Sequence, residues 1–314
     1  MFYISAASTI SHQPTFQNAG FSGMIVPLAA ESILISPDYK RFIEAGLLRR
    51  MSKILRMSVA CSKDCLEQAG VEQPDAIVVG TGLGCLQDTE KFLNHSITIE
   101  GLLPPTSFIQ STHNTMAGQI SLSIGNHGYN MTHTQNSLSF EHALQDAMLL
   151  LTEGENDILA GAADEYIEIL TEISCHLNVY PRSPLTSAAS FFLLSSKEKS
   201  GTLAQIKDVA TFGLVNSIPD TILALLAENE TNADALDLVL FAGNISNDLT
   251  IAGVDPDKSL DYKNLSGIYP TASAFALHYA VDRMQQDKSI RNVLICNALI
   301  KSNLGLTLLQ AIEA

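Results

Sequence analysis

The sequence predicts an α/β protein in which a buried sheet lies between layers of helices. Strand-like and helix-like patterns alternate through both halves of the chain, which is typical of layered α/β folds. The stretch at residues 187–196 carries apolar side chains on both faces, as a strand covered on both sides requires. With 314 residues, 46% of them hydrophobic, the chain can bury a large core. We therefore expect one compact body or two fused halves.

The elements of the first half follow from the period of their apolar residues. Short apolar or β-branched runs predict strands at residues 2–10, 75–80, 131–134 and 160–165. Apolar residues at spacings of three and four predict one or two helices at 39–69, ended by Gly70, and further helices at 89–94, 116–124 and 140–151.

The second half alternates in the same way but is shorter. Its predicted strands lie at residues 187–196, 202–209, 236–242, 291–298 and 305–309. Its predicted helices lie at residues 217–227 and 271–284.

The stretch from Gly128 to Glu165 is the centre of this organisation. A strand ends near Thr134, the period changes near Asn136 and Ser137, and a helix with one buried face follows. Such a turn lifts a side chain over the sheet and directs the free N–H groups of the helix toward the same point. The arrangement is typical of a nucleophile elbow.

Composition and charge exclude several classes of function. The net charge of −15 argues against nucleic acid or an anionic membrane as a partner, because phosphate surfaces would repel the protein. The five cysteines are an odd number without zinc-ribbon spacing, so we expect reduced thiols and no metal. No secretion signal or run of about 18 apolar residues is present. A cytoplasmic protein is predicted.

A glycine-rich turn follows the second strand. Its sequence from Gly80 to Gly84 is G-T-G-L-G, but no sustained helical pattern opens at the turn and no acidic residue ends a second strand at the expected distance. Dinucleotide binding needs both features. We therefore predict a structural turn and no cofactor.

The run AGQISLSIGNHGYNMTHTQNS, followed without a gap by SFEHALQDA, resembles the nucleophile region of the β-ketoacyl synthases, which belong to the thiolase-like superfamily. The family has a Cys at the elbow, and the resemblance puts that position on Ser137. The AG at 117–118, the GYN at 128–130, His142 and the AGAADE at 160–165 also match the family frame.

The resemblance implies a layered α/β/α/β/α fold made of two related halves. The implied division is an N-terminal half of the ketosynthase N-terminal type at residues 1–195 and a shortened C-terminal half at 196–314. Family members are usually longer, so the segments that form caps and lids are expected to be trimmed.

The other family catalytic positions are also altered. The resemblance places one catalytic histidine on Ala242 and the other on Ile268, while Lys263 matches the family lysine. The loop that gates the family's acyl pocket is reduced to residues 297–303. No metal or cofactor is implied, and the predicted substrate-binding residues are Gln135, Asn136, Phe140, Asn244 and Asn297.

Ser137 has two interpretations. A serine needs a base that accepts its proton, and His133 and His142 are not placed like triad bases by their spacing. Ser is also a favoured helix N-cap. We expect a capping role for Ser137, with catalysis as the alternative.

The losses of the thiol and both imidazoles predict a non-condensing, chain-length-factor-type subunit. It would pair with an active ketosynthase and meet an acyl carrier protein in a type II fatty-acid or polyketide-like pathway, such as that of aryl-polyene pigments. The alternatives are a divergent 3-oxoacyl-carrier-protein synthase, acyltransferase or hydrolase using Ser137, and a homodimeric acyl-binding scaffold. Family members dimerise through the strand before the elbow, here residues 128–134.

Overall fold

The ten strands found in the described residues belong to one sheet. The computed structural model describes residues 1–179, 183–300 and 302–312. The strands are β1 (Phe2–Ile10), β2 (Ala76–Gly80), β3 (Tyr129–His133), β4 (Asp157–Asp164), β5 (Ala188–Ser195), β6 (Ala204–Phe212), β7 (Leu238–Ala242), β8 (Ser259–Asp261), β9 (Asn292–Asn297) and β10 (Leu304–Gln310). Their order is β3-β2-β4-β5-β1-β6-β10-β9-β7-β8.

The strand order repeats about the β1–β6 junction. In the first half β2 is parallel to β3 and β4, while β5 is antiparallel to β4 and β1. In the second half β7 is parallel to β8 and β9, while β10 is antiparallel to β9 and β6. Within the sheet, the two halves meet where Phe2–Ile4 pairs with 204–206. This repeat supports our proposed division into residues 1–195 and 196–314.

Eleven α-helices are found in the described residues. They are α1 (Ala45–Leu48), α2 (Lys53–Ala69), α3 (Leu86–Thr98), α4 (Pro105–Gln110), α5 (Thr115–Ile124), α6 (Ser139–Glu153), α7 (Glu168–His176), α8 (Ile218–Glu228), α9 (Ser246–Ile251), α10 (Lys263–Ser266) and α11 (Ser273–Gln286).

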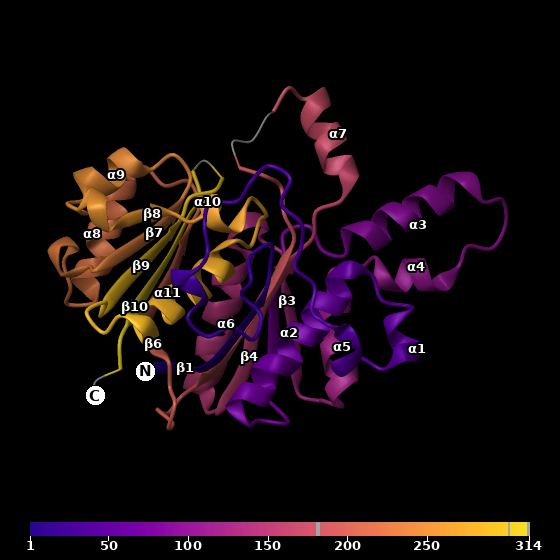
Figure 1. Ribbon diagram of the computed structural model, residues 1–314, viewed down its shortest axis with the longest axis horizontal. Helices are drawn as coiled ribbons and strands as arrows, with labels where there is room; N and C mark the ends of the chain where they lie inside the picture. The colour runs from indigo at the N-terminus through magenta and orange to yellow at the C-terminus, as the bar shows by residue number, and fades with distance from the viewer. Residues whose placement is uncertain (180–182, 301, 313–314) are drawn as a thin grey trace.

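The helices form three layers around the two half-sheets (Figure 1). Helices α6 and α11 lie in the middle, and each contacts strands of both halves. Helices α2 and α5 cover the outer face of the first half-sheet, and α8 and α9 cover that of the second. Three hydrophobic clusters fill the spaces between these layers. The layered α/β/α/β/α arrangement predicted from the sequence is confirmed.

Most predicted elements are confirmed, and the differences have local causes. The first strand has the predicted bounds, and α2 ends at Gly70, which adopts a left-handed conformation. The helix predicted at residues 89–94 forms the middle of α3, but α3 begins at Leu86, so the prediction that no sustained helical pattern opens at the glycine-rich turn was wrong. Asp88 is the only buried residue of this helix, and its apolar side chains are partly or fully exposed, so burial does not mark its bounds. The short elements β8, α9 and α10 were not predicted.

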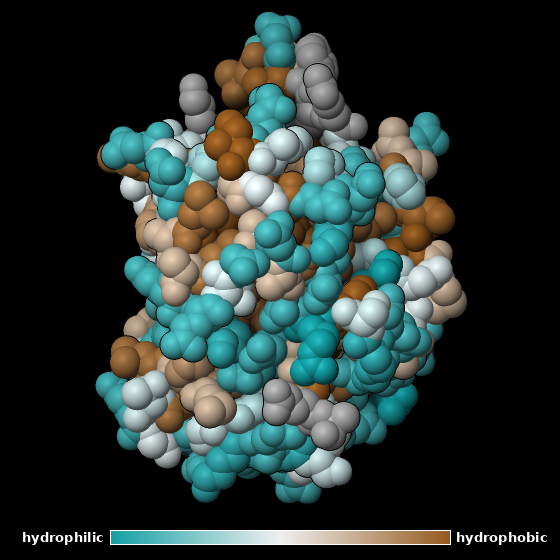
Figure 2. All heavy atoms as spheres, turned by 90° about the vertical axis from the view of Figure 1, so that its left-hand side faces the viewer, coloured by the Kyte–Doolittle hydropathy of each residue, from teal (hydrophilic) through white to brown (hydrophobic). Residues whose placement is uncertain are grey.

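The surface of the molecule on the side of α8 and α9 is largely hydrophilic, with scattered apolar side chains (Figure 2). Within the described ranges, no helix is long and apolar enough to cross a membrane.

Candidate functional site

The elbow is built from β3, a single 3-10 turn at Asn136–Leu138 and α6. Asn136 has a φ of 55°, in the left-handed region that Asn tolerates better than most residues. Its side chain is exposed, whereas Ser137 is only 1% exposed. The prediction that Ser137 presents its side chain at the elbow was therefore wrong, because the backbone turns one residue earlier and Asn136 occupies the tip.

Ser137 is not a helix cap either. The residue that precedes α6 is Leu138, which makes no side-chain cap, and the Ser137 hydroxyl has no hydrogen-bond partner among the described residues. The predicted capping role was wrong because the 3-10 turn separates Ser137 from the first turn of α6. His133 on β3 is not positioned as a base for Ser137. Its Nε2 lies 2.9 Å from Asp146 Oδ2, and its ring stacks on that of His142.

Ser137, Glu141, Ala242 and Asn297 come together beneath the elbow. The Asn297 side-chain amide donates to the Ser137 carbonyl at 2.7 Å and to Glu141 Oε1 at 2.8 Å. Ala242 on β7 pairs with Asn297 on β9. Burial raises the pKa of Glu141, so this carboxyl favours its neutral form. Glu141 was not predicted, and nothing in its sequence context distinguishes it from an exposed helical Glu.

The family histidine position at Ile268 lies on the other side of the elbow. Ile268 forms a parallel bridge with Leu185, and it lines a cavity of about 210 Å³ together with Glu165 and residues of α7. A Cβ on Gly82 would lie 2.2 Å from Pro270 and 3.2 Å from the Asn136 carbonyl oxygen, so this segment packs directly against the elbow. Ser137, Ala242 and Ile268, which the sequence resemblance puts at the family catalytic positions, thus lie on different elements around the elbow.

The remaining predicted residues occupy varied environments. Lys263 pairs with Asp261 at 3.3 Å, and Asn244 lines a separate cavity with Ala298. Gln135 is exposed beside Asn136, and the Phe140 ring is buried against Phe192 at 5.7 Å. Their roles in substrate binding stay predictions. Residue 301 of the predicted gating loop lies outside the described residues.

Asp164 organises the glycine-rich turn. Its buried carboxylate accepts hydrogen bonds from the Thr81 hydroxyl and from the backbone N–H groups of Gly82 and Leu83. It also accepts from both the N–H and the hydroxyl of Thr271. Because an internal carboxylate occupies the N–H groups that would cradle a phosphate, the turn has the structural role predicted from the sequence.

The described residues offer no thiol at the elbow and no metal cluster. Cys61, Cys65, Cys85 and Cys296 are buried, and burial raises the pKa of each thiol. Only Cys175 is exposed. Nowhere in the described part of the chain do three or more His, Cys, Asp or Glu side chains form a group that could hold a metal ion.

The family model for the β-ketoacyl synthase N-terminal domain matches residues 33–210, which is more than half of the chain. The chain belongs to the β-ketoacyl synthase family. No curated protein matches it.

Three solved structures show the same fold over 99% of both chains. The ishigamide ketosynthase/chain length factor is 16% identical with a TM-score of 0.82. A β-ketoacyl synthase from Burkholderia phymatum STM815 is 12% identical with a TM-score of 0.74. The AntDE:AntF complex of a type II polyketide synthase acyl-carrier protein with its ketosynthase is 13% identical with a TM-score of 0.76. The thiolase-like fold predicted for this β-ketoacyl synthase relative is confirmed.

The buried Glu165 gives a test of the region around Ile268. Burial raises its pKa to about 7 from 4.5, although Gln87 N–H donates to Oε1 at 3.0 Å. A folded-state pKa above the unfolded one means that the native state binds the proton more tightly, so the contribution of Glu165 to stability is fully present below pH 4.5 and is lost as pH rises to about 7. This difference in pKa amounts to about 3 kcal/mol.

We expect Glu165→Gln to remove this part of the pH dependence, because Gln has no proton to lose. Urea unfolding of both proteins between pH 4.5 and pH 8 measures it, and the stability gained by the variant should grow with pH. Parallel stability curves for the two proteins would show that Glu165 keeps an ordinary pKa.

Proposed function

We propose that this protein is a non-condensing, chain-length-factor-type subunit that pairs with an active ketosynthase. The observation that carries the proposal is the altered site itself. Asn136 stands at the exposed tip of the elbow, and the family histidine positions hold Ala242 and Ile268. Condensation needs a thiolate that accepts the acyl group and donors that stabilise the enolate oxygen. The amide of Asn136, the methyl group of Ala242 and the aliphatic side chain of Ile268 supply neither a thiolate nucleophile nor imidazole donors.

The edge of the sheet supports pairing with another chain. Strand β3 is the terminal strand, so one row of its N–H and C=O groups is unpaired, and the side chains of Tyr129 and Met131 are exposed. Exposed apolar residues also collect on α3, on α4 and between them, at Leu93, Ile97, Leu102, Phe108 and Ile109. In Figure 1 these two helices project from the body beside α5. A partner that adds a strand at β3 would extend the sheet.

The solved relatives suggest the pathway class. Two of them are a ketosynthase/chain length factor and a complex of a ketosynthase with its acyl-carrier protein. We infer that the complex formed by this chain works in a type II polyketide or fatty-acid-like pathway in the cytoplasm. Its growing chain would be carried by an acyl carrier protein, with an aryl-polyene-type pigment as one product class. Hydrolysis or acyl transfer by Ser137 is disfavoured because the hydroxyl is buried and no base contacts it among the described residues.

We expect the protein alone to release no CO₂ from malonyl-carrier protein, and to form a tight complex with a partner ketosynthase that has an intact Cys-His-His site. Light scattering after gel filtration measures the complex, and product formation by the mixture measures function.

Met131→Arg should weaken the complex at least about 30-fold, because it puts a charge into the interface.

Leu223→Arg is the matched control, since Leu223 is 43% exposed on α8 and Met131 is 40% exposed on β3. Condensation or decarboxylation by the protein alone would contradict the proposal. So would a stable homodimer that excludes every candidate ketosynthase, which would favour the scaffold alternative.

A further inference from the structure

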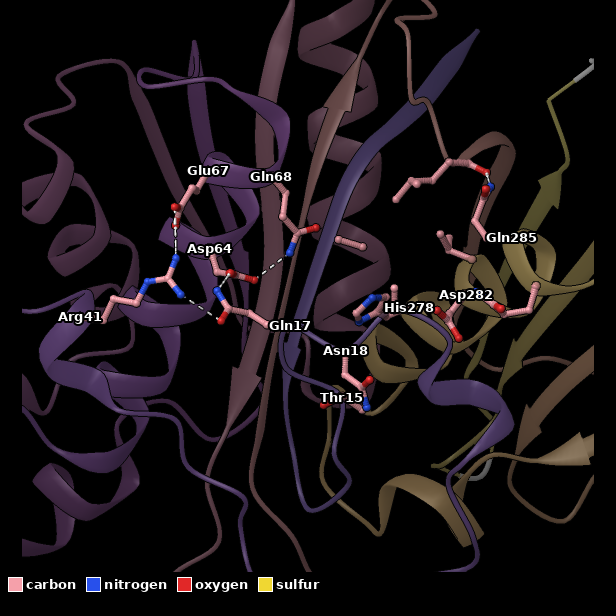
Figure 3. Close-up of a pocket in the computed structure, with 15 residues that line it drawn as sticks. Thr15, Gln17, Asn18, Arg41, Asp64, Glu67, Gln68, His278, Asp282 and Gln285 are labelled. Atoms are coloured by element: carbon pink, nitrogen blue, oxygen red, sulfur yellow. Dashed lines mark hydrogen bonds and ion pairs between the residues drawn. The ribbon is translucent and has the colours of Figure 1, made fainter.

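A cavity of about 500 Å³ lies apart from the elbow and shares no residue with it. It opens beside β1, where this strand has parted from β6 after only three paired residues. Its walls come from β1, the loop after it, Arg41, the second half of α2, Leu203 and the second half of α11 (Figure 3). Arg41 and Glu67 form an ion pair with each other at 3.2 Å, and both side chains are more than half exposed. None of these residues takes part in the chemistry expected of the family.

The first charged group of this cavity is Asp64 on α2. It is 2% exposed, and its carboxylate accepts hydrogen bonds from the Ser8 hydroxyl and from the side-chain amides of Gln17 and Gln68. It forms no ion pair in the described part of the chain. Because a carboxylate has about four lone-pair sites, three neutral donors leave one acceptor position.

The second charged group is Asp282 on α11. It is 7% exposed and accepts only two hydrogen bonds, from the backbone N–H groups of Gly20 at 2.7 Å and Ser22 at 2.9 Å. It too has no ion-pair partner within the described ranges. Buried carboxylates are normally paired with a cation, so two unpaired ones lining the same cavity form an unusually electronegative site.

His278 adds an acceptor between the two carboxylates. The Thr9 hydroxyl donates to Ser190, so it must accept from His278 Nδ1–H at 2.8 Å. This leaves the lone pair of Nε2 without a partner among the described residues. Burial lowers the pKa of His278 to about 4, so the ring is neutral near pH 7. Figure 3 shows Asp64 and Asp282 on opposite sides of His278.

Part of the wall is apolar, at Ala7, Leu203 and Val281, and Thr15 and Asn18 add neutral polar groups. The cavity therefore offers two buried carboxylates that form no ion pair among the described residues, a neutral acceptor between them, and hydrocarbon surface along part of its wall. A ligand that matches this pattern has two cationic ends joined by methylene groups.

We propose that this cavity binds an unbranched alkyl diamine, with one ammonium group at Asp64 and the other at Asp282. Each ammonium has three N–H donors, which can use the remaining carboxylate lone pairs and His278 Nε2. The methylene chain packs against Ala7, Leu203 and Val281. The site requires neither the condensing chemistry nor a partner subunit.

Calorimetric titration of the full chain with putrescine, cadaverine, butylamine and butanediol tests the proposal. We expect at least one of the two diamines to bind, butylamine to bind about 10- to 100-fold more weakly because one charge-assisted contact is lost, and butanediol not to bind. Asp64→Asn and Asp282→Asn should each weaken diamine binding by a similar factor. Asp234→Asn, which removes the same charge at an exposed position on the second half, should leave binding unchanged.

A substitution that keeps both carboxylates guards against misfolding of the Asn variants. Ala19 is exposed and lines the cavity, so Ala19→Phe fills the space without disturbing the core, and it should abolish diamine binding. The proposal is overturned if neither diamine binds at millimolar concentration, if butylamine binds as tightly as the diamines, or if Ala19→Phe binds like the wild type.

Discussion

Asn136→Cys is expected to react rapidly with iodoacetamide in the folded protein, whereas Ser137→Cys is expected to stay unmodified. The reason is the difference in accessibility at the elbow, where Asn136 is exposed and Ser137 is 1% exposed. The free N–H groups at the start of the following helix should also lower the pKa of a thiol at the tip. Intact mass spectrometry after a short exposure measures the difference.

Both variants should be made in a Cys175→Ser background, because the other four cysteines are buried and only Cys175 would react. A Cys at φ 55° costs about 1 to 2 kcal/mol, so Asn136→Cys should be slightly less stable. Unfolding in urea before labelling should expose both thiols equally. Equal labelling of the two folded variants would contradict the assignment of the tip to Asn136.

Neither cysteine variant should condense acyl chains. The enolate oxygen has no imidazole donors at Ala242 and Ile268, and loss of such a donor typically costs about 10²- to 10³-fold each. Adding Ala242→His and Ile268→His to each cysteine variant therefore tests how much of the site survives. Elongation by the Ser137→Cys single variant would require an unrecognised base, although His133 is engaged with Asp146.

Asp164→Ala is expected to lower the free energy of unfolding by at least about 5 kcal/mol. The substitution leaves five donors on the glycine-rich turn and on Thr271 without their acceptor. Three of them are buried and two are partly buried, and each unsatisfied buried donor costs about 1–3 kcal/mol. This loss is comparable with the whole stability of many proteins, about 5–15 kcal/mol. Chemical denaturation, or the failure to obtain folded protein, measures it.

Asp157→Asn is the matched control because Asp157 begins the strand that Asp164 ends. Its ion pair with Lys199 is partly exposed, so its loss should cost about 1 kcal/mol or less. If Asp164→Ala is no less stable than Asp157→Asn, Asp164 does not hold the turn in place.

The sequence alone predicted the strands and helices whose apolar residues recur at the spacing of a buried face. Strand β1 has the predicted bounds, and the predicted apolar face of α6 packs into the central hydrophobic cluster. These predictions succeeded because side chains on one face of a helix or strand recur at a fixed spacing. For α3 the sequence predicted only residues 89–94 of Leu86–Thr98, because Asp88 is its only buried residue and burial therefore does not mark its ends.

The sequence resemblance puts the two family histidine positions on Ala242 and Ile268, and neither residue can supply an imidazole. Only the tertiary structure decided which residue occupies the elbow tip, since a shift of one residue in a turn leaves no periodic signal. Asn297, Glu141 and Asp164 likewise acquire their contacts from segments more than a hundred residues away in the chain. Hydrogen bonds between distant segments depend on how the two half-sheets pack around α6 and α11, which local sequence patterns do not encode.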